Sequence, residues 1–264
     1  MQQASNQQEH ALKAILLLVL GMSFIPLNDA LIKIMSQRLP LAEIVTMRAV
    51  ISLAILVVFT NGFRSVLALN SRTILLFVLR GMCLVAAMYF YFLALSSLPI
   101  STVVSIFFLS PLLITALSAV FLKEKIGSHR ITAVVLALLG VALIMRPGTS
   151  FFKLEMLLAL GSAVSYAIFQ VVTRRLKGVG DLPGLITIQH LCYLVSALPL
   201  LAYNLTGNWE QSGNQSVDFL FRQTVWPTFI EYAFFIVCAF AVLFLSFASS
   251  YAYRNAEASL IAPF

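Results

Sequence analysis

Two ionisable residues stand out because they interrupt long apolar stretches of the sequence. Asp29 is the only acidic residue well inside such a stretch, and Arg48 lies in the next stretch along the chain. A charged side chain at membrane depth is costly, so it usually has a partner and a function. If the two stretches are antiparallel helices, both residues lie roughly 10–12 Å below the same end, close enough for an ion pair. That pair could bind a substrate or respond to protons, or it could only fix two helices together.

Polar residues in later stretches extend this set of candidates. Tyr89 and Tyr91 offer rings and hydroxyl groups that could stack on a planar substrate. His190 could titrate near neutral pH and couple binding to a proton. Ordinary packing or a hydrogen bond between helices would explain each residue as well. The expected substrate-binding residues are Asp29, Arg48, Tyr89, Tyr91, Gln170, His190, Tyr166 and Tyr251.

Three charged residues form a second group of candidates, for a gate or rim. Lys33 and Glu43 lie nearer one membrane surface, and we expect their side chains to reach it. Arg80 lies within the first third of its stretch, where anchoring at the membrane interface competes with a role in the site.

The residue types argue against other chemistry. Cys83, Cys192 and Cys238 all lie inside apolar stretches, and an odd number there argues against a disulfide framework. No Cys/His spacing indicates a metal site and no nucleotide-binding Gly-x4-Gly-Lys-Ser motif occurs, so we expect no metal and no cofactor. An intramembrane protease would need a serine near a histidine, or two deep aspartates. Gly21-Met22-Ser23-Phe24 fits the first pattern only loosely. The sequence therefore predicts no enzyme.

The composition identifies the class of protein. Of 264 residues, 61% are hydrophobic and only 10% charged, against roughly 45–50% and 25% in an ordinary soluble domain. These values exclude a water-soluble globule. The net charge of +7 reflects Lys and Arg in short loops, so we expect no nucleic-acid partner.

Apolar blocks of about twenty residues indicate spanning helices, because a helix satisfies its own backbone hydrogen bonds in lipid. We expect an all-α, multi-pass membrane bundle. The predicted spans are residues 12–32, 41–61, 74–94, 99–121, 130–147, 155–173, 183–203 and 228–250, with a ninth opening near 256.

Basic residues in the loops predict the orientation. Ten Lys and Arg residues fall on the side of the N-terminus and five on the other, which favours a cytoplasmic N-terminus. The ten are Lys13, Arg64, Arg72, Lys123, Lys125, Arg130, Arg174, Arg175, Lys177 and Arg254; the five are Lys33, Arg38, Arg146, Lys153 and Arg222.

Weak echoes indicate an internal repeat. Residues 94–104 resemble residues 252–262 at an offset of 158, Arg48 aligns with His190 at an offset of 142, and Gly21 aligns with Gly161. The repeat holds five spans, an odd number, so the second copy enters the membrane from the opposite side. Such inverted repeats place a transport site near the midplane between the halves. A duplicated bundle could also serve as a scaffold.

Motifs around the fourth and fifth spans resemble the EamA domain of the drug/metabolite transporter superfamily. They are Ser110-Pro111, the turn Leu122-Lys123-Glu124-Lys125, and the stretch Gly140 to Gly148. Residues 252–264 look like the start of span nine in that family. The resemblance implies a first EamA repeat over residues 1–148 and a second, shortened one over 149–264. Members usually have ten spans, so we expect the rest of span nine and span ten in a longer chain.

The resemblance implies a permease of the inner (cell) membrane, a secondary transporter that moves a small organic solute by alternating access. Residues 28–33, Arg80-Gly81 and residues 89–91 look most like bacterial branches with riboflavin-type and S-adenosylmethionine-type uptake carriers. The expected partners are a small-molecule substrate and the lipid bilayer, and a homodimer stays open. The alternative is a membrane protein without transport activity: an intramembrane enzyme, a receptor or a scaffold.

Overall fold

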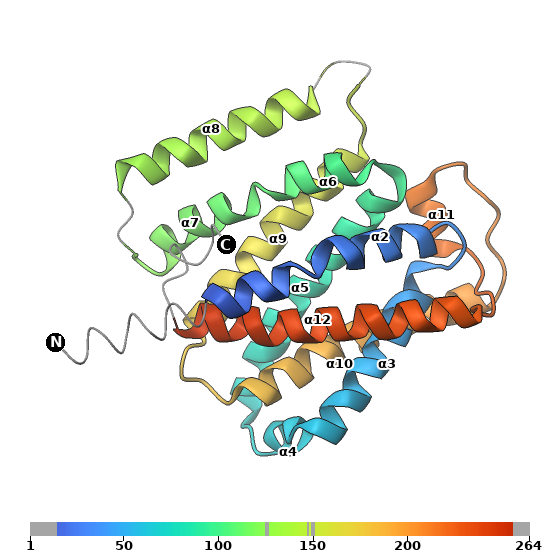
Figure 1. Ribbon diagram of the computed structural model, residues 1–264, viewed down its shortest axis with the longest axis horizontal. Coiled ribbons are helices and arrows are strands. Elements are labelled where there is room, and N and C mark those ends of the chain that lie inside the picture. The colour runs from blue at the N-terminus through green and yellow to red at the C-terminus, as the bar shows by residue number, and fades with distance from the viewer. Residues whose placement is uncertain (1–14, 125–126, 147, 149–150, 256–264) are drawn as a thin grey trace.

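The computed structural model describes residues 15–124, 127–146, 148 and 151–255 as a bundle of long helices (Figure 1). Every regular element in these residues is helical. Eight spans follow one another: Ile15–Met35, which ends in α2 (Ile25–Met35); α3 (Leu41–Phe59); α5 (Ser71–Ser97); Ile100–Phe121, formed by α6 (Ile100–Phe107) and α7 (Ser110–Phe121); α8 (Ser128–Met145); α9 (Glu155–Arg175); α10 (Leu182–Leu205); and α12 (Phe229–Asn255).

Helices occupy all eight predicted spans within the described residues. Seven are long and apolar enough to cross a membrane, and α8 contributes a shorter apolar stretch, Ile131–Met145. Two short helices outside the spans, α4 (Gly62–Leu67) and α11 (Gln215–Phe221), were not predicted. The predicted ninth span, Lys13 and Lys125 lie outside the described residues.

Two spans are interrupted where a proline opens a new helical segment. Pro26 lies in the first turn of α2 and Pro111 in the first turn of α7. Proline lacks an N–H and fixes its φ angle, so it suits the first turn of a helix and breaks its interior. The break before α2 lies just ahead of Asn28 and Asp29, which are buried.

The helix bounds repeat at the predicted offsets. The first span ends at Met35 and α9 ends 140 residues later, at Arg175. Helix α5 begins at Ser71 and α12 begins 158 residues later, at Phe229. Helix α5 packs on α9 and α10, and α12 packs reciprocally on α2 and α3. This exchange of contacts is the arrangement expected of two related units that pack against each other.

The two units run in opposite directions. Successive spans alternate in direction along the chain (Figure 1). At one end of the bundle, which we call the α11 end, Arg222 donates to the carbonyl of Ser36 after α2, and Asn214 donates to Glu155 at the start of α9. The last turn of the first span and the first turn of α9 therefore lie at the same end, as an inverted repeat requires.

The aligned glycines hold equivalent positions. A Cβ on Gly21 would lie 3.2 Å from Leu245 of α12, and one on Gly161 would lie 3.3 Å from Phe90 of α5. Each glycine thus allows the opening span of one half to approach the third span of the other.

Replacing Gly161 with leucine should therefore wedge α9 away from α5. Overpacking typically costs about 1–3 kcal/mol, which corresponds to a fall of roughly 3–8 °C in Tm. Thermal unfolding in detergent would measure it. Gly140→Leu is the matched control, because nothing lies within 4 Å of its added Cβ. Equal Tm values for the two variants would contradict the close approach of α9 and α5.

A folded loop covers the α11 end. The backbone N–H of Ser212 donates to Asp218 Oδ1 at 2.8 Å, and Trp209 Nε1 donates to the same oxygen at 3.1 Å. These hydrogen bonds, with the backbone N–H of Ser212 as the largest cause, lower the pKa of Asp218 below its ordinary value.

The loop should loosen in acid. Because the folded-state pKa of Asp218 is depressed, its stabilising effect is present above the unfolded pKa of about 3.9 and is lost as pH falls through the lower folded value. The fluorescence of Trp209, read in a Trp226→Phe background, should change over that range. Adding Asp218→Asn should abolish the transition, and a transition that survives it would refute the assignment.

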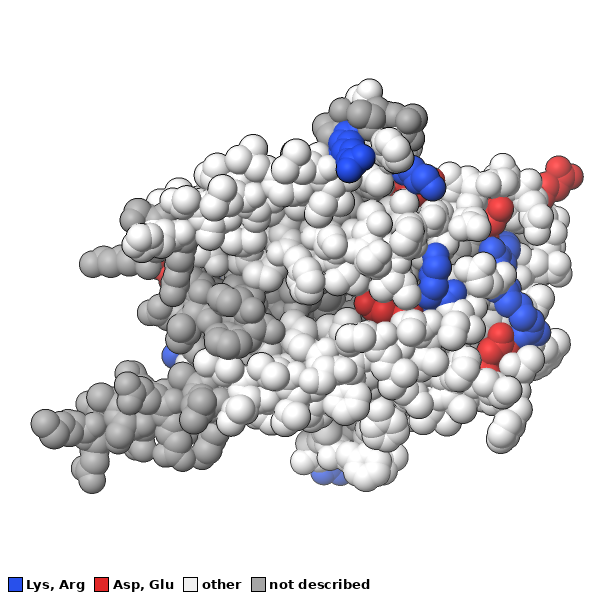
Figure 2. Space-filling view, turned by 45° about the horizontal axis from the view of Figure 1, so that its top comes forward, with Lys and Arg blue, Asp and Glu red and all other residues white. Residues whose placement is uncertain are grey.

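Charged side chains are unevenly distributed over the surface. Figure 2 shows most of the visible Lys, Arg, Asp and Glu residues toward one end of the molecule, with a middle zone that is almost free of them. Large exposed hydrophobic residues occur on most spans, including Val58, Leu136, Leu143 and Phe240. An apolar zone beside a charged end suits a protein surrounded by hydrocarbon.

Candidate functional site

Asp29 is held by a tyrosine rather than by the predicted arginine. Tyr91 of α5 donates its hydroxyl to Asp29 Oδ2 at 2.6 Å, and Asn28 Nδ2 donates to Oδ1 at 3.3 Å. Asp29 is 3% exposed. The described residues show no ion pair within 4 Å between Asp29 and Arg48, so the predicted pair is wrong. The depth estimate was compatible with a contact, but it could not give the direction in which each side chain points around its helix.

Arg48 of α3 is buried with a weak set of partners. Its side chain is 4% exposed, Nη2 lies 3.3 Å from the sulfur of Met88, and the guanidinium stands 5.3 Å from the ring centre of Phe92. Nη1 has no hydrogen-bond partner among the described residues. A buried cation with a thioether and a ring face as neighbours retains unused donor capacity.

An aromatic row leads from Asp29 into the second half of the chain. The ring of Tyr91 lies 5.2 Å from that of Phe107, Phe107 lies 5.3 Å from Tyr166, and Tyr166 lies 5.8 Å from Phe169. The first contact is edge-to-face and the other two are tilted, which are favourable geometries for aromatic pairs. The row joins α5 and α6 of the first half to α9 of the second.

The second half repeats the contact that holds Asp29. Gln170 of α9, one residue from the repeat position of Asp29, donates to Ser249 of α12 at 2.8 Å and to the hydroxyl of Tyr166 at 2.7 Å. Ser249 lies 158 residues after Tyr91, so it is the repeat counterpart of that tyrosine. Each half therefore has a polar contact between its first and third spans at nearly the same position. The first half uses a carboxylate there, and the second uses an amide.

Arg80 lies in the packed centre and not at the membrane interface. It is 0% exposed, and its guanidinium lies 4.2 Å from the ring centre of Phe169. The side chain donates to Thr173 at 2.7 Å, to Gln189 at 2.9 Å and to Ser250 at 2.7 Å, three residues on three different spans. The expected interface anchor is wrong, because the side chain turns inward to three acceptors of the second half.

His190 of α10 is buried in the same region. Nδ1 lies 3.0 Å from the carbonyl of Ile186, while Nε2 has no hydrogen-bond partner in the described part of the chain. Its ring packs edge-on against Tyr193 at 5.7 Å. Gln170 Oε1 is likewise buried and without a partner there.

Two predicted tyrosines lie beside this cluster. Tyr89 is half-buried against the main hydrophobic core, and Tyr251 is half-buried against a smaller one that contains Leu18 and Ile114. No side-chain contact among the described residues joins either one to the polar groups above.

The gate candidates Lys33 and Glu43 are turned into the protein. Lys33 Nζ donates to the carbonyls of Leu95 at 2.6 Å and Ser96 at 2.9 Å, which close the end of α5. Glu43 is 6% exposed, and its Oε2 has no hydrogen-bond partner among the described residues. Glu43 therefore does not reach the surface as expected, whereas Lys33 is half-buried and binds the last carbonyls of α5.

An ion pair seals the same end of the bundle. Arg38 pairs with Glu231 and donates to the carbonyl of Trp226 at 2.8 Å. These contacts tie the turn between the first two spans to the start of α12. The α11 end is therefore closed over the polar centre by charged groups from both halves.

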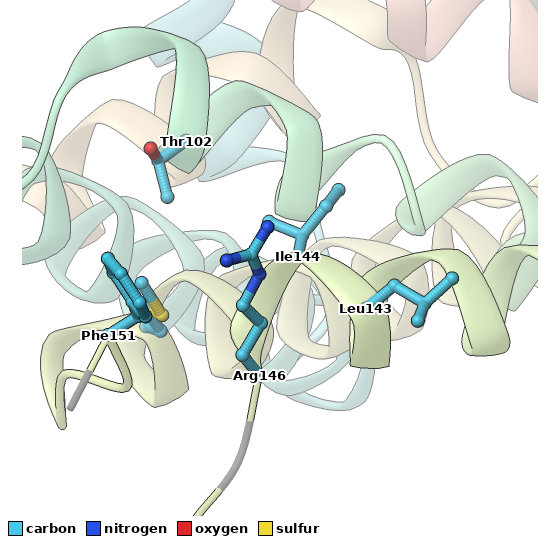
Figure 3. Close-up of a pocket in the computed structure, with 6 residues that line it drawn as sticks. Thr102, Leu143, Ile144, Arg146 and Phe151 are labelled. Atoms are coloured by element: carbon cyan, nitrogen blue, oxygen red, sulfur yellow. The ribbon is translucent and has the colours of Figure 1, made fainter. Parts of the chain in front are cut away.

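A separate cavity of about 480 Å³ lies away from the aromatic row. Its walls come from α6, α8 and the start of α9, and Figure 3 shows Arg146 pointing from the end of α8 toward Thr102. Arg146 also stands 5.3 Å from the ring centre of Phe151. None of the predicted site residues lines this cavity.

The sequence did not single out several residues of the cluster. Phe107 and Phe169 lie in continuous apolar blocks, where nothing separates them from packing residues. Thr173, Gln189 and Ser249 are neutral polar residues of ordinary types. Ser249 could have been predicted from the repeat, because it lies 158 residues after Tyr91.

Comparisons with known proteins agree with this architecture. The chain is 23% identical to an S-adenosylmethionine uptake transporter of Rickettsia prowazekii, over 90% of this chain and 79% of that protein. It is 28% identical to a riboflavin transporter of Vibrio cholerae, over 63% of this chain and 50% of that protein. It is 27% identical to a pseudopaline exporter of Pseudomonas aeruginosa, over 74% of this chain and 66% of that protein.

A solved crystal structure shares the fold. It matches with a TM-score of 0.64 and 21% identity, and covers 98% of this chain and 82% of the other. The sequence profile of the EamA-like transporter family matches residues 12–146, just over half of the chain. Together with the bundle of apolar spans, this match shows that the chain belongs to the EamA-like transporter family.

Proposed function

We propose that the chain moves a small organic metabolite through the interface between its halves, with Asp29, Arg48, Gln170 and His190 as the binding residues. The observation that carries this proposal is the aromatic row, which links the polar contact of one half to that of the other. Buried polar groups are expensive in a membrane unless they serve a purpose. Arg48, Gln170 and His190 each have a buried nitrogen or oxygen without a hydrogen-bond partner in the described part of the chain, which supports a binding role.

The ends of the bundle supply the parts of a gate. Alternating access requires that one end close while the other opens. The contacts of Lys33, Arg38 and Glu231 support closure at the α11 end, where the buried Glu43 is also proposed to act. Arg80 is proposed to act at the other end of the gate, because its three hydrogen-bond partners join α5 to the second half. Tyr89 and Tyr251 are proposed to line the path beside the row.

The loop charges support the orientation. More Lys and Arg residues lie at the end opposite α11, which favours an N-terminus in the cytoplasm of an inner membrane protein. The α11 loop would then face outward. The domain boundary near residue 148 follows from the repeat offsets.

Uptake by proteoliposomes tests the function. Radiolabelled S-adenosylmethionine and riboflavin are suitable first solutes, because relatives carry those names. A transporter gives uptake that saturates with solute concentration, whereas a receptor or scaffold binds solute without moving it. Absence of saturable uptake across a broad metabolite panel would refute transport.

A substitution in the second half tests the site. Gln170→Leu removes the hydrogen bonds to Tyr166 and Ser249 and should raise KM about fivefold or more, the effect of losing roughly 1 kcal/mol. Gln211→Leu, an exposed loop residue, is the matched control and should leave KM unchanged. If Gln170→Leu also leaves it unchanged, the path does not cross the interface of the halves at this point.

A further inference from the structure

We infer that the transported metabolite is a zwitterion whose cationic group binds Asp29 and whose carboxylate binds Arg48. This inference rests on the proposed function and narrows its substrate to one chemical class. It starts from the finding that these two side chains do not pair.

Opposite charges on neighbouring spans are kept apart. Asp29 and Arg48 are 3% and 4% exposed, and no ion pair within 4 Å joins them or pairs either with another described residue. In a membrane interior, a direct contact would relieve part of the penalty that each charge carries. The structure instead gives each charge a separate set of neutral neighbours. Such an arrangement suits a ligand that brings both missing charges.

The Asp29 side can accept a cation. Among the described residues, the Asp29 carboxylate accepts hydrogen bonds from Tyr91 and Asn28, and the bond from Asn28 is long at 3.3 Å. An ionised carboxylate accepts about four hydrogen bonds in total. Capacity therefore remains for an ammonium group, and the ring of Tyr91 fixes the carboxylate in place.

The Arg48 side can accept a carboxylate. Nη1 has no partner among the described residues, and the sulfur that Nη2 contacts is a weak acceptor. Phe92 lies against the guanidinium and limits its rotation. A guanidinium presents parallel N–H groups that match the two oxygens of a carboxylate. Nε2 of His190, also unpartnered, is a further donor to an anion in its N–H tautomer.

A compact head group could bridge the two side chains. The gap between the two charges exceeds the 4 Å limit of an ion pair. An α-amino acid carries its ammonium and carboxylate on one carbon, so this head group could sit between the side chains. The rest of the molecule would lie along the aromatic row that starts at Tyr91.

A panel of matched probes tests the charge requirement on the wild-type protein. Tryptophan, tryptamine and indole-3-propionate share one ring and differ in charge, and S-adenosylhomocysteine and 5′-methylthioadenosine form a second set. A ligand that binds the folded state raises Tm, so dose-dependent thermal shifts give affinities. We expect each zwitterion to bind about tenfold or more tightly than its singly charged or neutral counterparts, because each lost charge removes a charge-assisted hydrogen bond. Equal affinities within a set would overturn the inference.

A variant tests the assignment of the carboxylate. Arg48→Gln should weaken tryptophan binding about tenfold or more while leaving tryptamine binding nearly unchanged. Arg72→Gln, an exposed arginine on α5, should change neither. Equal weakening of both probes by Arg48→Gln would overturn the assignment, and the wild-type panel decides the charge class even if that variant does not fold.

Uptake measurements distinguish failure of the zwitterion inference from failure of the proposed transport function. Saturable riboflavin uptake that Arg48→Gln does not change would leave transport standing and overturn the zwitterion. If the protein takes up no solute of the metabolite panel, the proposed transport function is refuted.

Discussion

Replacing Arg80 with lysine should lower the free energy of unfolding by about 2–4 kcal/mol, because one ammonium cannot reproduce the contacts of a planar guanidinium. Arg80 donates to Thr173, Gln189 and Ser250 on three different spans, and stacks on Phe169. The substitution keeps the positive charge, so the cost of burying a cation stays in place. What changes is the number of oxygens that the cation can satisfy.

The expected shift is large enough to measure in detergent. For a chain of this size, the loss corresponds to a fall of roughly 5–10 °C in Tm. Arg80→Met should lose less than Arg80→Lys, since removing the charge offsets part of the lost hydrogen bonding. Arg72→Lys, on the exposed side of the same helix, is the matched control. A Tm for Arg80→Lys equal to that of the wild type would mean that the three contacts do not hold the halves together.

Asp29→Asn is expected to reduce uptake at low solute concentration by about tenfold or more, the effect of removing a charge-assisted contact to a cationic group. Asparagine has nearly the same shape, and its carbonyl can still accept the hydroxyl of Tyr91. The fold should therefore persist while the charge is lost.

Two measurements separate a binding role from a structural one. The Tm of Asp29→Asn should stay within about 2 °C of the wild type, because little packing changes. Glu210→Gln, which neutralises an exposed carboxylate in the loop, should leave both Tm and uptake unchanged. Normal uptake by Asp29→Asn would show that the carboxylate is not part of the path.

The spans could be predicted because the length of an apolar block can be read directly from the sequence. An apolar block of about twenty residues is long enough to cross hydrocarbon, and this length does not depend on which helices are neighbours. The offsets of the repeat were also visible, since Gly21 and Gly161 recur in equivalent packing positions. Helix α11 was missed because its seven residues are too few to give a comparable pattern.

The contacts of the site could not be predicted to the same degree. Depth along a helix follows from counting residues, but the direction of a side chain depends on how the helix is rotated in the bundle. Asp29 and Arg48 were placed at a common depth, yet Asp29 turns to Tyr91. Arg80 lies within the first third of its span, a position that suggests the membrane interface. Only the packing of α9, α10 and α12 around Arg80 shows that its side chain is buried between the halves.

The two corresponding contacts, Asp29 with Tyr91 and Gln170 with Ser249, lie at nearly the same repeat position and differ in charge. If the halves exchange conformations during a cycle, the amide enters the surroundings that the carboxylate leaves. The inward-open and outward-open forms then differ in free energy. The empty carrier then rests unequally between its two orientations. Because apparent affinity scales with the population able to bind, solute offered from opposite faces of the bilayer would half-saturate it at different concentrations.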